Sequence, residues 1–514
     1  MCVRRIVVLQ LPEAKDSARR QSRPLNMKRI VIIGGGISGL AAAHRLLELS
    51  KANNSPIHLT LLEASSRLGG IVQTTHRDGF LLERGPDSFI SEKPEALELV
   101  RRLGIESQLI QTNEQNRRSF IVRKDRLRPV PEGFQLMAPS RFWPFLTTDI
   151  FSLTGKLRMS ADLLLPRRSA NGNNDESLAS FVRRRLGREA LERMAQPMVG
   201  GIYTADPKSL SLRATLPRFL DMEQQDRSLI LSMWRKARTT KNQTGVSGPR
   251  YSLFLSFDEG MQVLVQALEK AVSDPGIEIR MNTKVNSLER PGSSLSSWRI
   301  STEKNEFFEA EAVCLAVPSY ISADLLSDVA PQLSPQLRAI GFASTATVNL
   351  AYRRADVAHK LDGFGFVVPF IEKRNLIACT FSSVKFKGRA PADQVLLRAF
   401  VGGALQPEML QLGDAEIVKR VERDLNELLG VKGKPLFVEL ARWNNSMPQY
   451  AVGHLDRVSQ IEKEVNKLNG LALAGNAYSG AGLPDCIRSG EQAAGLLIDG
   501  IFSSPPLRPL RLGG

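Results

Sequence analysis

The first regular structure that the sequence predicts is a short apolar run that leads directly into a cluster of glycines. Residues 29–33 read Arg-Ile-Val-Ile-Ile, and the segment 34–41 that follows reads Gly-Gly-Gly-Ile-Ser-Gly-Leu-Ala. Consecutive β-branched residues favour a buried strand, and the Ala- and Leu-rich stretch after the glycines favours a helix. A second apolar run, at 59–62, ends on Glu63. The pattern predicts strand, tight turn, helix and second strand.

Farther along the chain, the spacing of apolar positions predicts further helices and strands. Helical periodicity is present at 94–103, 261–272 and about 489–498. Strand-like runs lie at 277–288 (a strand pair), 312–318, 471–474, 346–352, 364–368, 376–381 and 395–401. The last four runs are typical of a mixed sheet. Between 111 and 248 the pattern is helical and basic, with loops expected at 172–174 and 239–248.

The glycines near the start have the spacing of a dinucleotide-binding turn. In such a turn Gly34 permits the bend, Gly36 lets the backbone approach a pyrophosphate, and Gly39 lets the helix pack against the strand. The first helical residues, Ile37 and Ser38, then present the helix N-terminus to the phosphates. Glu63 stands at the end of the second strand, where a carboxylate accepts hydrogen bonds from a ribose.

The residues beyond the acid favour FAD over NAD. Ala64 is followed by Arg67 and the pair Gly69-Gly70, and a second glycine pair suits a ligand that extends past the first helix. Near the other end, the run 471–474 enters Gly475 and leads through Ala481, Gly482 and Leu483 into a helix, whose N-terminus is expected to meet the flavin ring. The sequence shows no second strand-linked GxGxxG and no Cys-x-x-Cys, which favours an oxidase or desaturase over a reductase.

These elements predict an α/β fold in which a Rossmann-like FAD-binding domain is interleaved with an α+β substrate-binding domain. The FAD-binding domain is expected to comprise 27–110, 249–318 and 441–500, and the substrate-binding domain 111–248 and 319–440. Residues 501–514 are expected to form a tail. Residues 1–26 lack an apolar stretch of signal-peptide length and are interpreted as a disordered extension or as preceding the true start.

Composition and charge narrow the classes of partner. The 514 residues include 69 Lys and Arg against 53 Asp and Glu, a formal charge of +16. The basic clusters are at 117–118, 123–128, 167–168 and 183–188. No nucleic-acid-binding module accompanies them, so we expect no nucleic acid partner. Bulky apolar residues at 141–146 and 150–153, beside basic ones, fit either contact with a membrane surface or the core of the inserted domain.

Cysteine and histidine content argues against a disulfide framework and a metal site. The four cysteines lie far apart in the sequence, which suits a reducing compartment, and the five histidines show no ligand spacing. We therefore expect no metal and a cytoplasmic protein that is soluble or peripheral on a membrane. The sequence leaves the oligomeric state open, and a homodimer is one of the states that it allows.

Six segments together resemble oxygen-dependent protoporphyrinogen oxidase, including its bacterial branch that acts on coproporphyrinogen III. These segments are the first glycine motif, 63–70, 79–89 (Gly-Phe-Leu-Leu-Glu-Arg-Gly-Pro-Asp-Ser-Phe), 201–206 (Gly-Ile-Tyr-Thr-Ala-Asp), 442–454 (with Met-Pro-Gln-Tyr and Gly-His) and 475–490. The resemblance runs from about residue 27 to about residue 500. It implies a flavin amine oxidase fold, non-covalent FAD and a role in haem biosynthesis.

The resemblance also implies the reaction and its reactants. A porphyrinogen, either coproporphyrinogen III or protoporphyrinogen IX, loses six electrons to become the porphyrin, with dioxygen as acceptor and hydrogen peroxide as product. The flavin N5 takes the hydride, so no side chain of this sequence is expected to be catalytic. The basic excess leans toward the substrate with four propionates, coproporphyrinogen III.

Candidate site residues follow from the matching segments. The cofactor set adds Gly85, Pro86, Asp87, Ser88 and Val285, the last expected near adenine, to the glycines, Glu63, Ala64, Arg67 and C-terminal residues given above. The substrate set contains Met198, Gly201, Phe364, Val367 and Phe386, with Lys93 expected to meet a propionate. Two departures from the family pattern, Ile71 after the glycine pair and Glu259 before Gly260, leave local contacts there open.

Three other classes compete with this interpretation. An amine oxidase of the same superfamily is expected to bring an aromatic residue to the flavin, where this chain has Leu-Pro-Asp at 483–485. A carotenoid desaturase shares the flavin motifs, and the 447–454 segment argues against it. A non-enzymatic flavoprotein is disfavoured because no catalytic segment is missing.

Overall fold

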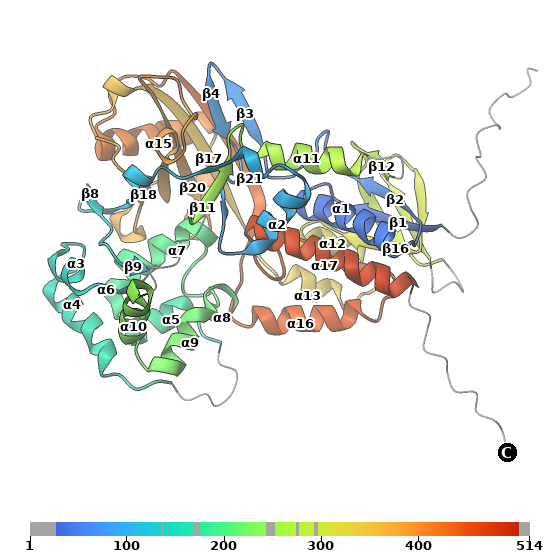
Figure 1. Ribbon diagram of the computed structural model, residues 1–514, viewed down its shortest axis with the longest axis horizontal. Coiled ribbons are helices and arrows are strands. Elements are labelled where there is room, and N and C mark those ends of the chain that lie inside the picture. The colour runs from blue at the N-terminus through green and yellow to red at the C-terminus, as the bar shows by residue number, and fades with distance from the viewer. Residues whose placement is uncertain are drawn as a thin grey trace, which may run out of the picture.

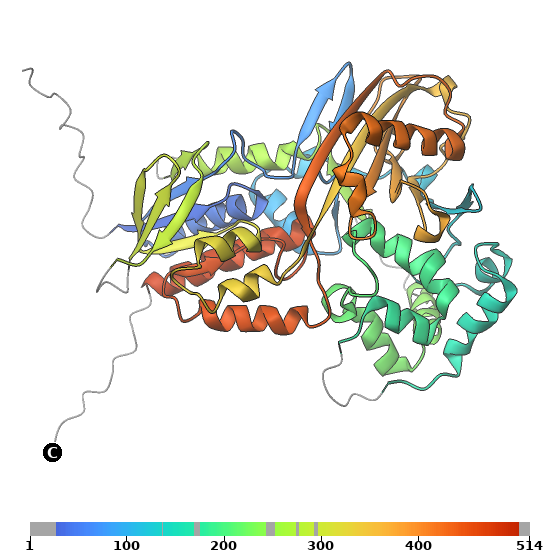
Figure 2. The same ribbon diagram turned by 180° about the vertical axis from the view of Figure 1, so that it is seen from behind.

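The computed structural model describes residues 27–135, 137–168, 175–242, 252–273, 277–291 and 297–502. Figure 1 shows two regions side by side: a sheet with helices on both faces on the right, and a second sheet above a group of helices on the left. Figure 2 shows the same arrangement from behind. The predicted α/β class, with two interleaved regions, is confirmed by this architecture.

A five-stranded parallel sheet, in the order β12-β2-β1-β16-β22, forms the centre of the first region. Its strands are β1 (Lys28–Ile33), β2 (Ile57–Leu62), β12 (Ile277–Arg280), β16 (Ala312–Leu315) and β22 (Leu471–Leu473). Ile30 and Ile32 of β1 are fully buried, as expected for a strand covered on both faces. The chain leaves this sheet after β2, after β12 and after β16 and returns each time, so its first and last strands share one sheet.

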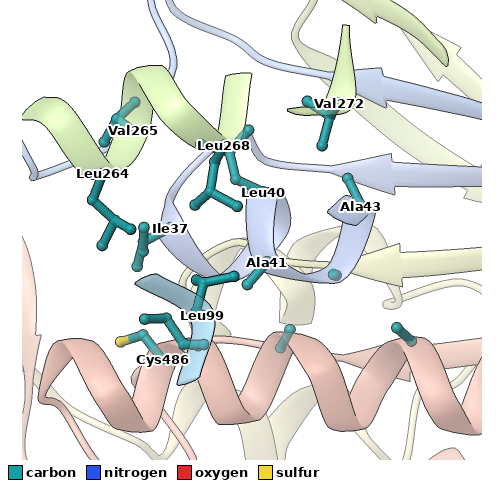
Figure 3. Packing of buried hydrophobic residues seen from close by; sticks show 14 of the residues in the cluster. Ile37, Leu40, Ala41, Ala43, Leu99, Leu264, Val265, Leu268, Val272 and Cys486 are labelled. Atoms are coloured by element: carbon teal, nitrogen blue, oxygen red, sulfur yellow. The ribbon is translucent and has the colours of Figure 1, made fainter. Parts of the chain in front are cut away.

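Small residues let helices pack closely on one face of this sheet. These helices are α1 (Ile37–Ala52), α2 (Pro94–Arg102), α11 (Gln262–Val272) and α17 (Leu483–Phe502). Figure 3 shows α1 lying between α11 and α17, with Leu40 facing Leu268 and Ala41 facing Leu99. A Cβ atom added to Gly490 would lie 2.1 Å from the carbonyl oxygen of Ser38. The last helix of the chain therefore presses directly on the first turn of the first helix.

The other face carries a small antiparallel sheet and three helices. The strands are β13 (Val285–Glu289), β14 (Trp298–Thr302) and β15 (Phe307–Ala310), and the helices are α12 (Ser319–Leu325), α13 (Ser334–Arg338) and α16 (His454–Val465). The strand pair predicted at 277–288 exists as two strands, but they do not pair with each other: β12 pairs with β2 and β13 with β14. Asn282 has a φ of 51°, and the turn around it redirects the chain between the sheets.

A seven-stranded sheet, in the order β21-β17-β20-β19-β18-β7-β8, forms the second region. Its strands are β7 (Phe120–Arg123), β8 (Arg126–Pro129), β17 (Phe342–Arg353), β18 (Gly365–Val367), β19 (Ala378–Phe381), β20 (Gln394–Gly402) and β21 (Phe437–Pro448), with α15 (Asp414–Leu429) packed beside them. The four runs predicted as a mixed sheet all form strands of it. The prediction of a helical pattern between the loops of 111–248 is wrong at 120–129, because β7 and β8 complete this sheet and β7 pairs in parallel with β18.

The helical region below this sheet has its own core. Its main helices are α3 (Phe142–Thr147), α4 (Leu153–Ser160), α5 (Leu178–Arg185), α7 (Gln196–Tyr203), α8 (Leu212–Thr215), α9 (Pro217–Asp226) and α10 (Leu229–Asn242). Helix α10 covers the first four residues of the loop predicted at 239–248. The rest of that loop and the one at 172–174 lie outside the described residues. Arg185, counted in a basic cluster, is fully buried and paired with Asp162 at 2.5 Å.

Short strands connect the two regions: β3 (Thr74–Arg77), β4 (Phe80–Glu83), β5 (Phe89–Ile90), β6 (Leu109–Gln111) and β11 (Phe254–Phe257). The carboxylate of Glu83 accepts hydrogen bonds from the backbone N–H of Met261 at 2.7 Å and from the hydroxyl of Thr74 at 2.9 Å. Its backbone carbonyl accepts one from Asn349 of β17 at 3.1 Å. Glu83 thus joins elements of both regions. In the part of the chain that the structure describes, no helix has the length and apolar character needed to span a bilayer.

Candidate functional site

The turn between β1 and α1 depends on two glycines for its shape. Gly34 has a φ of +106°, and its N–H donates to the carbonyl of Leu62 at 2.8 Å. A Cβ on Gly39 would lie 1.9 Å from the carbonyl oxygen of Gly34. Neither position accepts a side chain without moving the backbone, so both glycines are required by the fold itself.

Gly36 differs from these two because its surroundings are open. It is the N-cap of α1 with φ −70° and ψ 179°, and a Cβ built there would have no atom within 4 Å. No side chain caps the helix, and its first turn, with Ile37 and Ser38, contains no acid. The first-turn N–H groups and the positive end of the helix therefore face open space, which fits a phosphate-bearing ligand such as FAD.

A second glycine segment lies against the first. The N–H of Gly69 donates to the carbonyl of Gly35 at 2.8 Å, and a Cβ on Gly70 would lie 3.2 Å from the Cα of Gly36. Arg67 donates to the carbonyls of Leu68, Gly70 and Val72, which closes this loop on itself. Burial lowers the pKa of Arg67, assisted by the nearby Arg84. The two segments form one continuous backbone cradle.

Glu63 borders the cradle at the end of β2. Its carboxylate accepts from the N–H of Gly35 at 2.6 Å and from the N–H of Ser65 at 2.8 Å. Ala64, between Glu63 and Ser65 in the chain, is exposed. Val285 is buried in the same apolar cluster as Leu62. Glu63 and Val285 therefore both lie near the carboxyl end of β2, the edge where ligands bind in open α/β sheets.

The C-terminal segment meets this cradle through α17. The N–H of Gly475 donates to the Ser489 hydroxyl at 3.0 Å, and Gly490 touches Ser38 of α1, as described above. Ala481 and Gly482 immediately precede the helix, which begins at Leu483. Through Gly490, which lies inside α17 and not at its N-terminus, this helix is thus packed on Ser38 of the first glycine motif.

The segment 85–88 closes the group of cofactor candidates. A Cβ on Gly85 would lie 1.7 Å from the carbonyl oxygen of Ile71, next to the second glycine pair. Asp87, which follows Pro86 and precedes Ser88, accepts two hydrogen bonds from Lys385 at 3.0 Å and lies 3.8 Å from Arg398. Burial alone would raise the pKa of Asp87, but the two cations hold it well below its usual range.

The substrate candidates fall into two groups. Gly201 is exposed on α7, and a Cβ atom built on it would lie 3.7 Å from a methyl carbon of Val367 in β18. Met198 of α7 and Phe364, which precedes β18, are half-buried. Phe386 is only 2% exposed and lies between the charged ends of Lys385 and Arg389, which stand 5.1 Å and 5.6 Å from its ring centre. The structure thus brings Gly201 and Val367 together and places Phe386 in the core.

Lys93 is engaged with a carboxylate of the protein. Its ammonium group lies 2.6 Å and 2.7 Å from the two oxygens of Asp485, whose side chain is 4% exposed and also pairs with Arg488 at 2.6 Å. The Lys93 side chain itself is 45% exposed. Its charge therefore already has a partner at the start of α17, and a substrate carboxylate would share it with Asp485.

A small cavity of about 30 Å³ lies next to the C-terminal half of α7, where Gly200 forms part of its wall. Its walls include Gln196, Gly200, Thr204, Val368, Arg374 and Gln406. Thr204 was not predicted from the sequence as a site residue. In the structure it ends α7 with a φ of 48°, a conformation that β-branched residues rarely adopt. Lys385 and Arg398 were also missed, since no local pattern marks a lysine and a buried strand arginine as partners of Asp87.

Comparisons with known proteins agree with this geometry. A model of the family described as flavin containing amine oxidoreductase matches residues 37–498. The coproporphyrinogen III oxidase of Bacillus subtilis (strain 168) is 36% identical over 477 residues, which cover 93% of this chain and 99% of that protein. The chloroplastic protoporphyrinogen oxidase of Nicotiana tabacum is 30% identical over 90% of this chain and 84% of its own length.

Solved structures are similar along the same range. The crystal structure of a protein assigned as a protoporphyrinogen oxidase, from Exiguobacterium sp. 255-15, is 32% identical with a TM-score of 0.79 and covers 91% of this chain and 98% of its own. A putrescine oxidase shares the fold at a TM-score of 0.65 and 18% identity, with 92% of this chain and 99% of its own covered.

Proposed function

This chain belongs to the flavin containing amine oxidoreductase family, and from that premise we propose that it oxidises a porphyrinogen to the porphyrin in haem biosynthesis. The observation that carries the proposal is similarity to porphyrinogen oxidases over nearly the full length of both chains, at 36% identity to the Bacillus subtilis protein. Dioxygen is the electron acceptor and hydrogen peroxide the by-product in this proposal.

The described residues fit FAD. The backbone of 34–39 with its open N-cap, the loop 67–70, Glu63 and the start of α17 would hold the cofactor, and the open position at Gly36 leaves room for its pyrophosphate. When bound, FAD supplies the acceptor for hydride leaving a substrate carbon. The proposed FAD-binding domain is the region built on the five-stranded sheet, expected from the sequence at 27–110, 249–318 and 441–500. Helices α12 and α13 pack on this region although 319–440 was expected to bind substrate, and β21 extends the seven-stranded sheet past the expected boundary at 441.

The chain's own residues bind and orient the substrate. Gly201 presents backbone without a side chain beside Val367, which permits close approach of a flat macrocycle. Met198 and Phe364 add apolar surface in the same regions. These residues exclude water from the reacting carbon and move no proton, so we assign no acid or base to the chain.

We infer that the four-propionate substrate, coproporphyrinogen III, is preferred. Bacterial relatives named for it are 34–36% identical to this chain, and plant relatives named for protoporphyrinogen are 28–30% identical. The Exiguobacterium protein, assigned as a protoporphyrinogen oxidase, lies between them at 32%. The excess of basic residues contributes less to this inference than the sequence suggests, because Arg184 pairs with Glu223 and Arg185 pairs with Asp162 inside the protein.

The decisive experiment compares kcat/KM of the purified holoenzyme for both porphyrinogens, with oxygen uptake and porphyrin fluorescence recorded together. We expect porphyrin formation with both and at least a tenfold preference for coproporphyrinogen III. Equal values would remove the preference. Putrescine serves as the control substrate, and turnover of putrescine without turnover of either porphyrinogen would replace the proposal by an amine oxidase.

The flavin is held without a covalent bond in this proposal. Each cysteine within the described residues, Cys314, Cys379 and Cys486, is buried, and burial raises the pKa of all three thiols well above the usual range. None is a ready thiolate for attachment to the flavin ring. Acid precipitation of the protein should leave all the flavin in the supernatant, and flavin in the pellet would contradict this.

We further propose that the α3–α4 face contacts an anionic membrane surface. It exposes large apolar side chains, with Trp143 at 73%, Leu153 at 79% and Leu157 at 73%. Two basic residues lie on the same two segments: Arg141, which pairs with Glu132 at 2.8 Å, and Lys156, whose ammonium donates to the carbonyl of Leu146 at 2.6 Å. Apolar side chains next to basic ones are the features of a peripheral lipid-binding surface.

Sedimentation with vesicles tests this contact. Wild-type protein should pellet with vesicles that contain phosphatidylglycerol and remain in solution with pure phosphatidylcholine. The change Trp143→Ser with Leu157→Ser should abolish binding while the turnover of dissolved substrate stays unchanged. Equal sedimentation of variant and wild type would exclude this face as the contact.

A further inference from the structure

The segment 447–454, Met-Pro-Gln-Tyr-Ala-Val-Gly-His, belongs to no step of the proposed reaction. It spans the end of β21 and the first residue of α16. Tyr450 is 2% exposed and His454 is 1% exposed, although both carry polar groups. Two buried polar rings in a connecting segment need hydrogen-bond partners, and those partners identify what the segment does.

The hydroxyl of Tyr450 bridges two points of one loop. It accepts a hydrogen bond from the N–H of Gly480 at 3.0 Å and donates one to the carbonyl of Asn476. Both partners lie in 475–482, the loop that leads into α17 and that bears the C-terminal cofactor candidates. One phenol oxygen thus fixes the distance between two turns of that loop.

His454 holds the same loop between those two points. Its Nε2 lies 2.9 Å from the carbonyl oxygen of Tyr478, which can only accept, so Nε2 carries the proton. Its Nδ1 is buried without a partner, which suits the neutral ring, and burial lowers the pKa of His454. The two rings stack on each other at 4.2 Å between centres with an angle of 18°. Tyr450 and His454 therefore act on the loop as one rigid unit.

The other side of this unit faces the proposed substrate helix. The backbone carbonyl of Tyr450 accepts from the N–H of Ser211 at 2.7 Å, and its ring lies 6.3 Å from that of Tyr203, the last residue of α7. The amide of Gln449 donates to the carbonyl of Tyr203 at 3.4 Å. The segment thus touches α7, which carries Gly201, and the flavin-side loop at the same time.

We propose that Tyr450 and His454 are positioning residues that set the 475–482 loop, and with it the start of α17, at a fixed place relative to α7. The reactants lie between these two elements in the proposed function, so the pair fixes the alignment of substrate and cofactor without touching either. The inference rests on the proposed function only for its effect on turnover.

The test uses Tyr450→Phe, which removes one hydroxyl and keeps the ring, and His454→Phe, which keeps the stacked ring and removes the donor to Tyr478. The matched control is Tyr352→Phe, because Tyr352 is equally buried but lies in β17 of the other sheet. Hydrogen exchange of a peptide that covers 475–482, the absorption spectrum of the bound flavin, and KM and kcat are recorded for each holoenzyme.

We expect the amide of Gly480 to exchange about three- to tenfold faster in Tyr450→Phe, the scale set by the loss of one buried hydrogen bond. The flavin bands should shift, and kcat should fall several-fold with a smaller change in KM. The control should leave all of these unchanged. Unchanged exchange, spectrum and kcat in Tyr450→Phe would overturn the proposal even if His454→Phe fails to fold. A wild-type protein that oxidises neither porphyrinogen would refute the proposed function alone, because exchange and spectrum still decide this one.

Discussion

Gly36 and Gly39 belong to one motif, and the structure predicts that replacing them has opposite consequences. Gly36 has an extended backbone that any residue adopts, and nothing lies within 4 Å of a Cβ built there. The change Gly36→Val should therefore leave the stability of the apoprotein within about 0.5 kcal/mol of wild type. In Gly39→Ala the new Cβ would stand 1.9 Å from the Gly34 carbonyl, so α1 must shift, at a cost of about 1–3 kcal/mol or more.

Cofactor affinity should respond in the other order. The valine side chain would fill the space that the pyrophosphate needs to reach the first-turn N–H groups of α1. Loss of two charge-assisted hydrogen bonds, at about 1.5–3 kcal/mol each, weakens FAD binding by at least about a hundredfold. Titration of apoprotein with FAD, followed by flavin fluorescence, measures the affinity, and denaturant unfolding of the same apoprotein measures the stability.

Two results would refute this reasoning. Full flavin occupancy in Gly36→Val would show that the cofactor does not approach the helix here. A strongly destabilised Gly36→Val apoprotein would show that the open space at this position is filled by the protein's own atoms. Gly413→Val is the matched control, since its Cβ also meets nothing within 4 Å and it lies at the N-terminus of α15, remote from the cradle.

Three further predictions concern charge and packing. Lys93→Met should raise KM for the porphyrinogen several-fold, about 1 kcal/mol, with little change in kcat; a lower melting temperature with unchanged KM would assign Lys93 to neutralising Asp485. Burial raises the pKa of Glu83 to about 7. As the pH rises, this carboxyl ionises in the unfolded chain before it ionises in the folded protein, so the wild-type protein should lose up to about 3 kcal/mol of unfolding free energy between pH 4.5 and 7. Denaturant unfolding at pH 5 and pH 8 should show this loss in the wild type and not in Glu83→Gln. Gly490→Ala should lower both the melting temperature and FAD affinity, because its Cβ would press on Ser38; unchanged values would show that α17 moves freely on α1.

The sequence predicts the cofactor cradle well because its parts are local. A turn that needs glycine, a buried β-branched strand and a carboxylate at a strand end each leave a signal within a few residues. The structure places 34–39, Glu63 and 69–70 in contact, as that pattern indicates. Strands β17, β18, β19 and β20 of the mixed sheet were equally visible, since each contains an apolar run, whereas β7, β8 and β21 of the same sheet were not predicted.

Contacts between distant segments were not predictable in the same way. The ion pair of Lys93 with Asp485 joins residues 392 positions apart, and that of Asp87 with Lys385 joins residues 298 positions apart. The first pair is set by how α2 and α17 pack within one region and the second by how the two regions meet, and a single sequence carries no record of that packing. For the same reason the sequence places Arg185 in the basic cluster at 183–188 without indicating that its side chain lies in the core.

The packing of Gly490 on Ser38 has a consequence for biosynthesis. The first strand, the glycine turn and the first helix leave the ribosome early, but Gly490 of the helix that packs against them lies 452 residues after Ser38. At about 5–20 residues per second, that interval lasts from roughly 20 to 90 s. Throughout it, the nascent chain holds an unfinished nucleotide cradle with an exposed apolar face on α1. We therefore expect flavin loading to follow the synthesis of α17, because a chain that stops before this helix leaves the apolar face of α1 that α17 covers exposed to solvent.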